Sequence, residues 1–213
     1  KGELAESVGR RGGVMVLNAG DPFFPVLRER AKGARILTFQ GRHNQANVQA
    51  ALAAASGLGI PEAVALEGLK GFRPPAMRLE ERVLPGGIRL VNDAYNANPD
   101  SVRAALDWLA AEPAGRRLAV LGGMRELGES SQSLHREAGA TAARSGVSFL
   151  VAVGPSGPWL LAGYLEAGGA EGILAGDAAE AARRLKPLLL EGDLALFKAS
   201  RAEGLERVLE ALA

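Results

Sequence analysis

Two kinds of hydrophobic pattern alternate along the second half of the chain. Short runs rich in valine and leucine are typical of strands, and longer segments whose apolar residues recur every three or four positions are typical of helices. The short runs predict strands near residues 79–84, 88–92, 118–122, 149–153 and 194–198. The longer segments predict helices near residues 99–111, 131–145, 158–167, 178–190 and 201–212. This alternation predicts an α/β fold with right-handed crossovers and a doubly wound, mostly parallel sheet.

The first part of the chain shows the same pattern on a smaller scale. Short core strands are expected at residues 14–17 and 36–39. Helices are expected after Asn44, where alanine and valine recur on one face, and near residues 61–71. This part is therefore also expected to be α/β.

A proline pair separates the two parts of the chain. Pro74-Pro75 stiffens the backbone and cannot continue a helix, so we expect two domains, residues 1–76 and 77–213. Just after this boundary, the turn signal Pro85-Gly86-Gly87 leaves open an edge hairpin over residues 78–89.

The densest set of polar side chains lies at a predicted strand-to-helix turn, residues 92–101. Asn98, Pro99 and Asp100 are explained by folding as well as by function, because they are typical of the cap and first turn of a helix. Four further polar residues have no such explanation: Asn92, Asp93, Tyr95 and Asn96. Open α/β sheets bind ligands outside the carboxyl ends of their strands, so we expect these four to face a ligand.

The composition limits the classes of function. With 47% hydrophobic and 23% charged residues and a net charge of +1, the chain is typical of a globular protein, and its charge favours neither nucleic acid nor an anionic membrane as partner. It has no cysteine and two histidines, which excludes thiolate chemistry and disfavours a histidine metal cluster. No apolar run approaches the roughly 18 residues that span a bilayer. We expect a cytoplasmic, monomeric enzyme or binding protein.

Two common nucleotide motifs are missing from the sequence. The glycines that follow predicted strands do not have the G-x-G-x-x-G spacing, which disfavours a nicotinamide oxidoreductase. There is also no G-x-x-x-x-G-K-[ST] loop, so the usual cradle for ATP phosphates is absent from these residues. The chain begins at Lys1, and we expect it to be a fragment that is inactive alone.

Several weaker signals allow two interpretations. Asn44 and Asn47 could offer amides to a heterocycle, although Asn44 could equally cap a helix. Lys198 and Arg201 flank a predicted helix start, where anions bind. His135 falls inside a predicted helix and is expected to be a structural residue rather than a catalytic base.

Two helix starts have the spacing of a capping box, in which two side chains satisfy free backbone N–H groups reciprocally. These are Asp177 with Glu180, and Ser200 with Glu203. Both pairs are therefore explained without any function.

Taken together, the motifs resemble the Mur ligases, in the branch that adds D-alanyl-D-alanine. The matching segments run in the family's order from one end of the chain to the other: residues 16–22, 43–47, 92–101, 120–128, 134–135, 198–201 and 206–208. The run Ala94-Tyr95-Asn96-Ala97-Asn98-Pro99 is specific to this branch, whereas His43-Asn44-x-x-Asn47 is shared more widely. The resemblance implies that residues 1–76 are the last part of a central ATP-binding domain and that residues 77–213 are a Rossmann-like C-terminal domain.

The resemblance also implies an activity and partners. The parent enzyme would use ATP and Mg²⁺ to join D-Ala-D-Ala to UDP-N-acetylmuramoyl-tripeptide through an acyl phosphate, in peptidoglycan precursor synthesis. Asn44 and Asn47 would contact the adenine, Asp93 the ribose and Arg78 the phosphates. Lys1 would be the carbamylated lysine that helps to place magnesium. The side chains near the dipeptide would be Tyr95, Asn96, Asn98, Lys198, Ser200 and Arg201.

Other interpretations remain open from sequence. The chain could be a non-catalytic binding module on a Rossmann-like sheet. It could also belong to a neighbouring Mur ligase branch that adds the third amino acid, although the D-N-P-R selector of that branch is absent. Folylpolyglutamate synthetase shares the ancestral fold, but the run over residues 94–99 argues against it.

Overall fold

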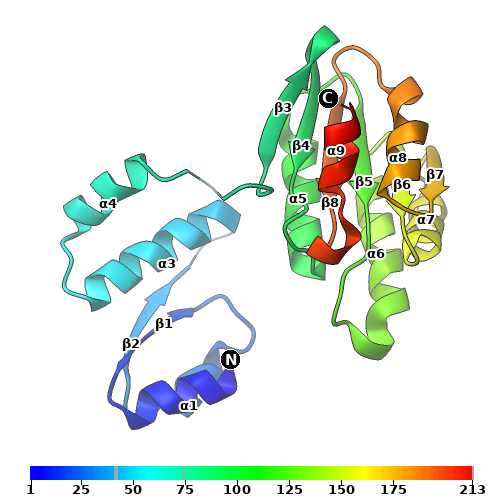
Figure 1. Cartoon of the computed structure of the whole chain (residues 1–213). Coiled ribbons are helices and arrows are strands. Elements are labelled where there is room, and N and C mark those ends of the chain that lie inside the picture. Colours follow the sequence, from blue (N-terminus) through cyan, green and yellow to red (C-terminus); the bar gives the residue numbers. More distant parts are fainter. Residues whose placement is uncertain (41–42, 74, 213) are drawn as a thin grey trace. The chain divides into compact units, whose positions relative to one another are not determined.

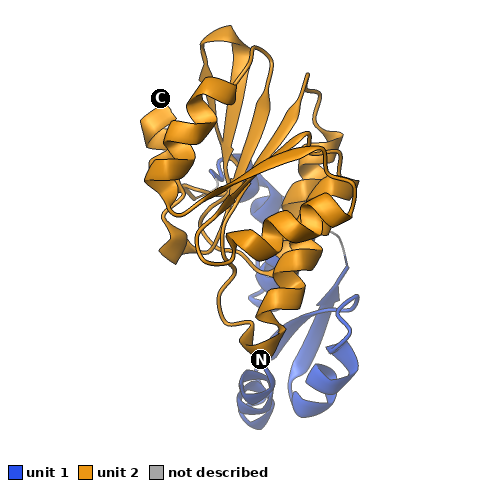
Figure 2. Cartoon of the chain, turned by 90° about the vertical axis from the view of Figure 1, so that its right-hand side faces the viewer, with its two compact units in different colours: residues 1–73 blue, residues 74–213 orange. Residues whose placement is uncertain are grey.

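The chain divides into two compact units, residues 1–73 and 74–213 (Figure 2). The computed structural model describes residues 1–40, 43–73 and 75–212, with the backbone alone for residues 43–45. The division falls close to the proline pair at which the sequence predicts a boundary.

Unit 1 contains a pair of parallel strands with helices around it (Figure 1). Its described elements are α1 (Gly2–Arg10), β1 (Val14–Asn18), α2 (Phe24–Arg30), β2 (Arg35–Phe39), α3 (His43–Gly57) and α4 (Glu62–Lys70). The sequence predicts the strands and the last two helices, but not α1 and α2. The buried core of this unit is small and consists of Ala5, Leu17, Leu27 and Ala31.

Unit 2 is built on a six-stranded sheet with the order β3-β4-β8-β5-β6-β7 (Figure 1). The strands are β3 (Glu80–Leu84), β4 (Ile88–Asn92), β5 (Arg117–Leu121), β6 (Phe149–Val153), β7 (Glu171–Ala175) and β8 (Leu194–Lys198). The helices are α5 (Pro99–Ala111), α6 (Ser131–Arg144), α7 (Gly157–Glu166), α8 (Ala178–Leu185) and α9 (Glu206–Leu212). Among the described strands, only β3 is antiparallel to its neighbour, which confirms the predicted, mostly parallel α/β sheet. The edge hairpin that the sequence leaves open is present as β3 and β4.

Helices cover both faces of this sheet (Figure 2). One core packs against α5, α6 and α7, and the other packs against α8 and α9. Successive residues of a strand enter opposite cores, as Val120 and Leu121 do in β5. Because the central strands are buried on both faces, they are almost uninterrupted apolar runs in the sequence.

The structure differs from the prediction at three elements. Strand β7 was not predicted. The helix expected near residues 201–212 is divided into the 3₁₀ turn η4 (Arg201–Glu203) and α9, because Gly204 has a φ of 64° in the left-handed region. The helix expected near 178–190 ends at Leu185, and the 3₁₀ turn η3 (Lys186–Leu188), which contains a proline, follows it.

Among the described residues, no helix is long and apolar enough to cross a membrane.

Candidate functional site

Strands β4, β8 and β5 are parallel neighbours in the sheet of unit 2, so their carboxyl ends lie side by side. The chain leaves β4 and β5 toward the helices of one face, but it leaves β8 toward α9 on the opposite face. Such a reversal is the position at which open α/β sheets bind their ligands. We therefore take residues 92–101, which we call the corner, together with residues 122–125 and 198–201, as the candidate site.

Two asparagines of the corner hold its backbone. Asn92 is 2% exposed, and its Oδ1 accepts a hydrogen bond from the N–H of Ala94 at 3.1 Å. The Oδ1 of Asn96 accepts from the N–H of Ala97 at 2.8 Å, although Asn96 itself is exposed. The prediction that Asn92 faces a ligand is therefore wrong in this structure, since the residue is buried and holds its own turn.

Asn98 caps helix α5, as its position predicts. Its Oδ1 accepts from the N–H of Ser101 at 2.8 Å, and the Ser101 hydroxyl accepts from the N–H of Asn98 at 3.0 Å. Pro99 occupies the first turn and Asp100 adds a negative charge to the helix start. The predicted folding role is confirmed, and the contact of Asn98 with a substrate stays a prediction.

Lys198 is buried beneath the corner, and its ammonium contacts polar groups of the corner. The residue is 3% exposed, and its ammonium donates to the carbonyl oxygens of Asp93 and Asn96 at 3.2 and 2.8 Å. It also pairs with the Asp93 carboxylate at 2.8 Å. An ammonium has three protons, so this geometry favours a role in holding the corner over the predicted contact with a substrate carboxylate.

Ser200 connects the three loops of the site. Its hydroxyl accepts from the N–H of Arg125 at 3.0 Å and lies 3.5 Å from the carbonyl oxygen of Ala97. Its own N–H donates to Gly123 at 2.9 Å. The capping box predicted for Ser200 and Glu203 is therefore wrong, because the hydroxyl contacts loops far away in sequence and does not cap the helix start.

Glu203 also contacts the loop after β5. Its side chain is 9% exposed, and its carboxylate pairs with the guanidinium of Arg125 at 2.8 Å.

The capping box predicted for Asp177 and Glu180 is half correct. Asp177 caps α8 by accepting from the N–H of Glu180, but the Glu180 carboxylate accepts from the N–H of Gly176 and not from that of Asp177.

His135 holds the loop after β5 by a hydrogen bond to its backbone. It is completely buried in α6, and its Nε2 accepts from the N–H of Met124 at 2.9 Å. Its Nδ1 lies 2.6 Å from the carbonyl oxygen of Ser131, so this nitrogen carries the proton. The residue is structural, as the sequence suggests.

Exposed side chains of the site gather around the start of unit 2. Tyr95 is 47% exposed, and the guanidinium carbon of Arg78 lies 4.4 Å from the centre of its ring. The guanidinium of Arg201 is also exposed and lies 3.7 Å from the carboxylate of Glu206. The edge of unit 2 thus presents two arginines, an aromatic ring and the amide of Asn96.

Three predicted site residues belong to unit 1. Lys1 is 81% exposed and lies 3.9 Å from the carboxylate of Asp21. Asn47 is exposed on α3, and the side chain of Asn44 lies outside the described residues. Within the described part of the chain, no group of three or more histidine, cysteine, aspartate or glutamate side chains could hold a metal ion.

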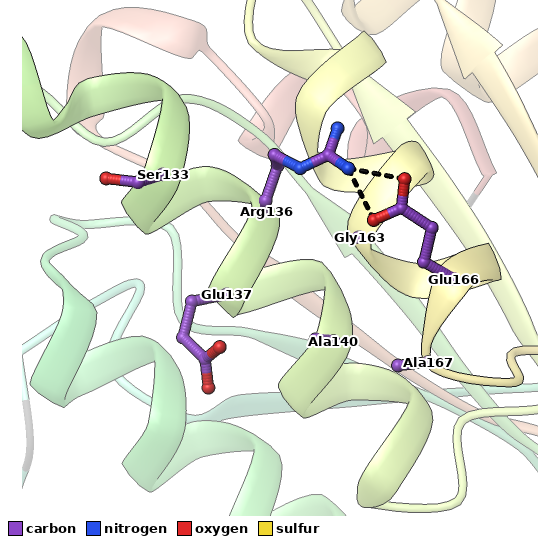
Figure 3. A pocket seen from close by; sticks show the side chains of 7 residues that line it. All are labelled: Ser133, Arg136, Glu137, Ala140, Gly163, Glu166 and Ala167. Carbon is purple, nitrogen blue, oxygen red and sulfur yellow. Dashed lines mark hydrogen bonds and ion pairs between the residues drawn. The ribbon is translucent and has the colours of Figure 1, made fainter.

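Two hollows in the described part of the chain lie away from the corner. One, of about 350 Å³, is a shallow groove between α6 and α7 that the ion pair of Arg136 and Glu166 crosses (Figure 3). The other, of about 530 Å³, lies in unit 1 beside α3 and includes Thr38 and Gln49. Neither contains a residue of the corner.

Comparison with known proteins assigns the chain to a family. Residues 77–201 match the family model described as the Mur ligase, glutamate ligase domain. The chain belongs to the Mur ligase family. The Mur ligase resemblance of the sequence is thereby confirmed.

Two of the similar proteins have the same activity in their names. The UDP-N-acetylmuramoyl-tripeptide–D-alanyl-D-alanine ligase of Bacillus subtilis (strain 168) is 34% identical over 174 residues, which cover 81% of this chain and 38% of that protein. The ligase of the same name from Escherichia coli (strain K12) is 32% identical over 179 residues, which cover 83% of this chain and 38% of that protein. The Mur ligase chain thus spans about two fifths of the length of these relatives.

Solved structures agree with the sequence comparison. A crystal structure of MurF from Acinetobacter baumannii has a TM-score of 0.82 and 25% identity, covering 94% of this chain and 51% of that one. MurF ligase from Thermotoga maritima in complex with ADP has a TM-score of 0.75 and 25% identity, covering 93% and 52%.

Proposed function

We propose that this chain is part of an ATP-dependent ligase that joins D-Ala-D-Ala to UDP-N-acetylmuramoyl-tripeptide in peptidoglycan precursor synthesis. The observation that carries the proposal is the family match over residues 77–201, which includes the corner and its branch-specific run, residues 94–99. The relatives named above have this activity in their names. Because the reaction consumes ATP, the proposal places the enzyme in the cytoplasm.

The proposed reaction proceeds in two steps. A carboxylate is a poor electrophile, so transfer of the γ-phosphoryl group of ATP first converts the tripeptide carboxylate into an acyl phosphate. The amine of D-Ala-D-Ala then attacks the acyl carbon, the C–N bond forms, the C–O bond to phosphate breaks, and the amine loses a proton. Phosphoryl transfer depends mainly on positioning and on stabilising negative charge.

Asp93 and Arg78 are the residues of unit 2 proposed to meet the nucleotide. One oxygen of the Asp93 carboxylate pairs with Lys198, which orients the group, and the side chain is 18% exposed, so it can accept a hydrogen bond from a ribose hydroxyl. The exposed guanidinium of Arg78 would contact the phosphates. Asn44 and Asn47 are proposed for the adenine. Lys1, as its carbamate, is proposed to help to place Mg²⁺ in the whole enzyme.

The dipeptide is proposed to bind beside the corner. Arg201 has an exposed guanidinium that could pair with the dipeptide carboxylate, and the exposed amides of Asn96 and Asn98 could contact its peptide bond. Lys198 and Ser200 are buried and engaged, so we assign them to holding these residues in place.

The full-length enzyme provides the test. Purified enzyme should convert UDP-N-acetylmuramoyl-tripeptide, D-Ala-D-Ala and ATP into the pentapeptide product, followed by mass spectrometry, with one phosphate released per product. Omission of D-Ala-D-Ala is the matched control and should abolish product formation. Addition of a single amino acid to a dipeptide precursor, with no use of D-Ala-D-Ala, would assign the chain to a neighbouring branch instead.

A further inference from the structure

The segment that leads into β3 has an unusual backbone. Met77 and Leu79 have φ angles of 63° and 53°, in the left-handed region that side chains other than glycine seldom adopt. Contacts hold the segment there: Met77 is 9% exposed in the core, and its N–H donates to the carboxylate of Glu80 at 3.0 Å. Strained backbone of this kind persists only where surrounding contacts maintain it, and it concentrates at functional sites.

Arg78 lies between these two residues and projects over the corner. The N–H of Tyr95 donates to the carbonyl oxygen of Met77 at 3.2 Å, which ties the segment to the corner. The guanidinium carbon of Arg78 lies 4.4 Å from the ring centre of Tyr95, within the range of a cation–π contact. Backbone and side chain therefore fix Arg78 relative to the corner at two points.

The guanidinium of Arg78 contacts the aromatic ring of Tyr95 and not a carboxylate, and this difference decides whether its charge stays available. Among the described residues, none of the ion pairs found within 4.0 Å involves the guanidinium of Arg78. A ring holds the guanidinium by its face, whereas a carboxylate would neutralise its charge and occupy its N–H groups. The five N–H donors stay available to an anion.

We propose that Tyr95 is a positioning residue that holds the Arg78 guanidinium ready for the phosphates of ATP, and that it acts through Arg78 rather than by touching D-Ala-D-Ala. This inference rests on the proposed function. An arginine held in place before binding loses less conformational freedom when the anion arrives, so removal of the ring weakens the contact even though the charge remains.

The first experiment uses the 213-residue chain and requires no activity. NMR should show side-chain signals of Arg78 shifted upfield by the ring current of Tyr95. Tyr95→Leu should abolish this shift, and Tyr95→Phe, the matched control that keeps the ring, should preserve it. Both variants keep the backbone N–H of residue 95. Arg78 signals that are the same in the wild type and in Tyr95→Leu would overturn the inference.

The second experiment uses the full-length enzyme and separates the two substrates. Tyr95→Leu should lower kcat/KM for ATP about fivefold, the rate equivalent of a cation–π contact, whereas Tyr95→Phe should change it less than about twofold. The KM for D-Ala-D-Ala should stay the same in both. In an Arg78→Ala background, Tyr95→Leu should have no further effect.

The outcomes separate the inference from the proposed function. A raised KM for D-Ala-D-Ala, or a Tyr95→Leu effect that persists without Arg78, would overturn the positioning role while leaving the ligase activity in place. A wild-type enzyme that does not ligate D-Ala-D-Ala would instead overturn the proposed function and with it the role assigned to Arg78.

Discussion

Helices α6 and α7 cross so closely that the contact tolerates no side chain at two glycines. A Cβ at Gly139 would lie 1.9 Å from the carbonyl oxygen of Leu160, and a Cβ at Gly163 would lie 1.9 Å from that of Arg136. Both obstructing atoms belong to the backbone, so no side-chain rotation can relieve the clash. Gly139→Ala therefore tests how closely the two helices pack.

The expected effect is the balance of two opposing terms. Alanine is favoured over glycine inside a helix by about 1 kcal/mol. Against this gain, the methyl group would approach about 1.5 Å closer than an ordinary contact, and such overpacking typically costs about 1–3 kcal/mol. Because backbone must move, we take the upper end and expect a net loss of about 2 kcal/mol in the free energy of unfolding.

Urea denaturation followed by tryptophan fluorescence measures this loss. Trp108 and Trp159 are the two tryptophans of the chain and both lie in unit 2, so the signal reports the unfolding of that unit. Gln132→Ala, an exposed position of α6, is the control and should change stability by less than about 0.5 kcal/mol. A Gly139→Ala variant that unfolds at the same or a higher urea concentration than the wild type would refute the reasoning.

Three further predictions concern unit 2. Lys198→Met should lower the free energy of unfolding by about 3–5 kcal/mol, since Asp93 loses its buried partner, and adding Asp93→Asn should recover part of the loss in the same urea assay. Asn98→Ala should cost about 1 kcal/mol through loss of the α5 cap; an unchanged urea midpoint would contradict this. Burial raises the pKa of Tyr164 above its ordinary value of 10.0, so its contribution to stability is complete below that pH and is lost as the pH rises through the raised pKa. Tyr164→Phe should reduce this loss of stability at alkaline pH, measured as melting temperatures over a series of pH values on either side of 10.0.

The sequence predicts best those elements whose signal is local. Strands β6 and β8 are predicted to the residue because burial on both faces makes them nearly continuous apolar runs. Strand β7 escapes prediction because it lies at the edge of the sheet, begins with Glu171 and Gly172, and is only partly buried. The break before α9 depends on one left-handed glycine, Gly204, whose conformation the helical spacing around it conceals.

The candidate site shows the same limit. The cap at Asn98 is predictable because both partners lie within four residues. The contacts of Ser200 with Arg125, and of Lys198 with the carbonyl of Asn96, join positions 75 and 102 residues apart. Such contacts depend on which strands become neighbours, so residue spacing cannot reveal them, and the capping box expected for Ser200 was wrong for this reason.

The close helix crossing also has a consequence at the sheet edge. Gly139 lies one helical turn after His135, whose ring is 5.9 Å from that of Trp159 in α7 and accepts the amide of Met124. If α6 shifted along α7, the His135 imidazole would move with it, together with the N–H of Met124 that it binds. The conformation of the loop after β5 would then change. The two glycines lie in the helix crossing and outside the loop, but by fixing the crossing they also fix the position of that loop.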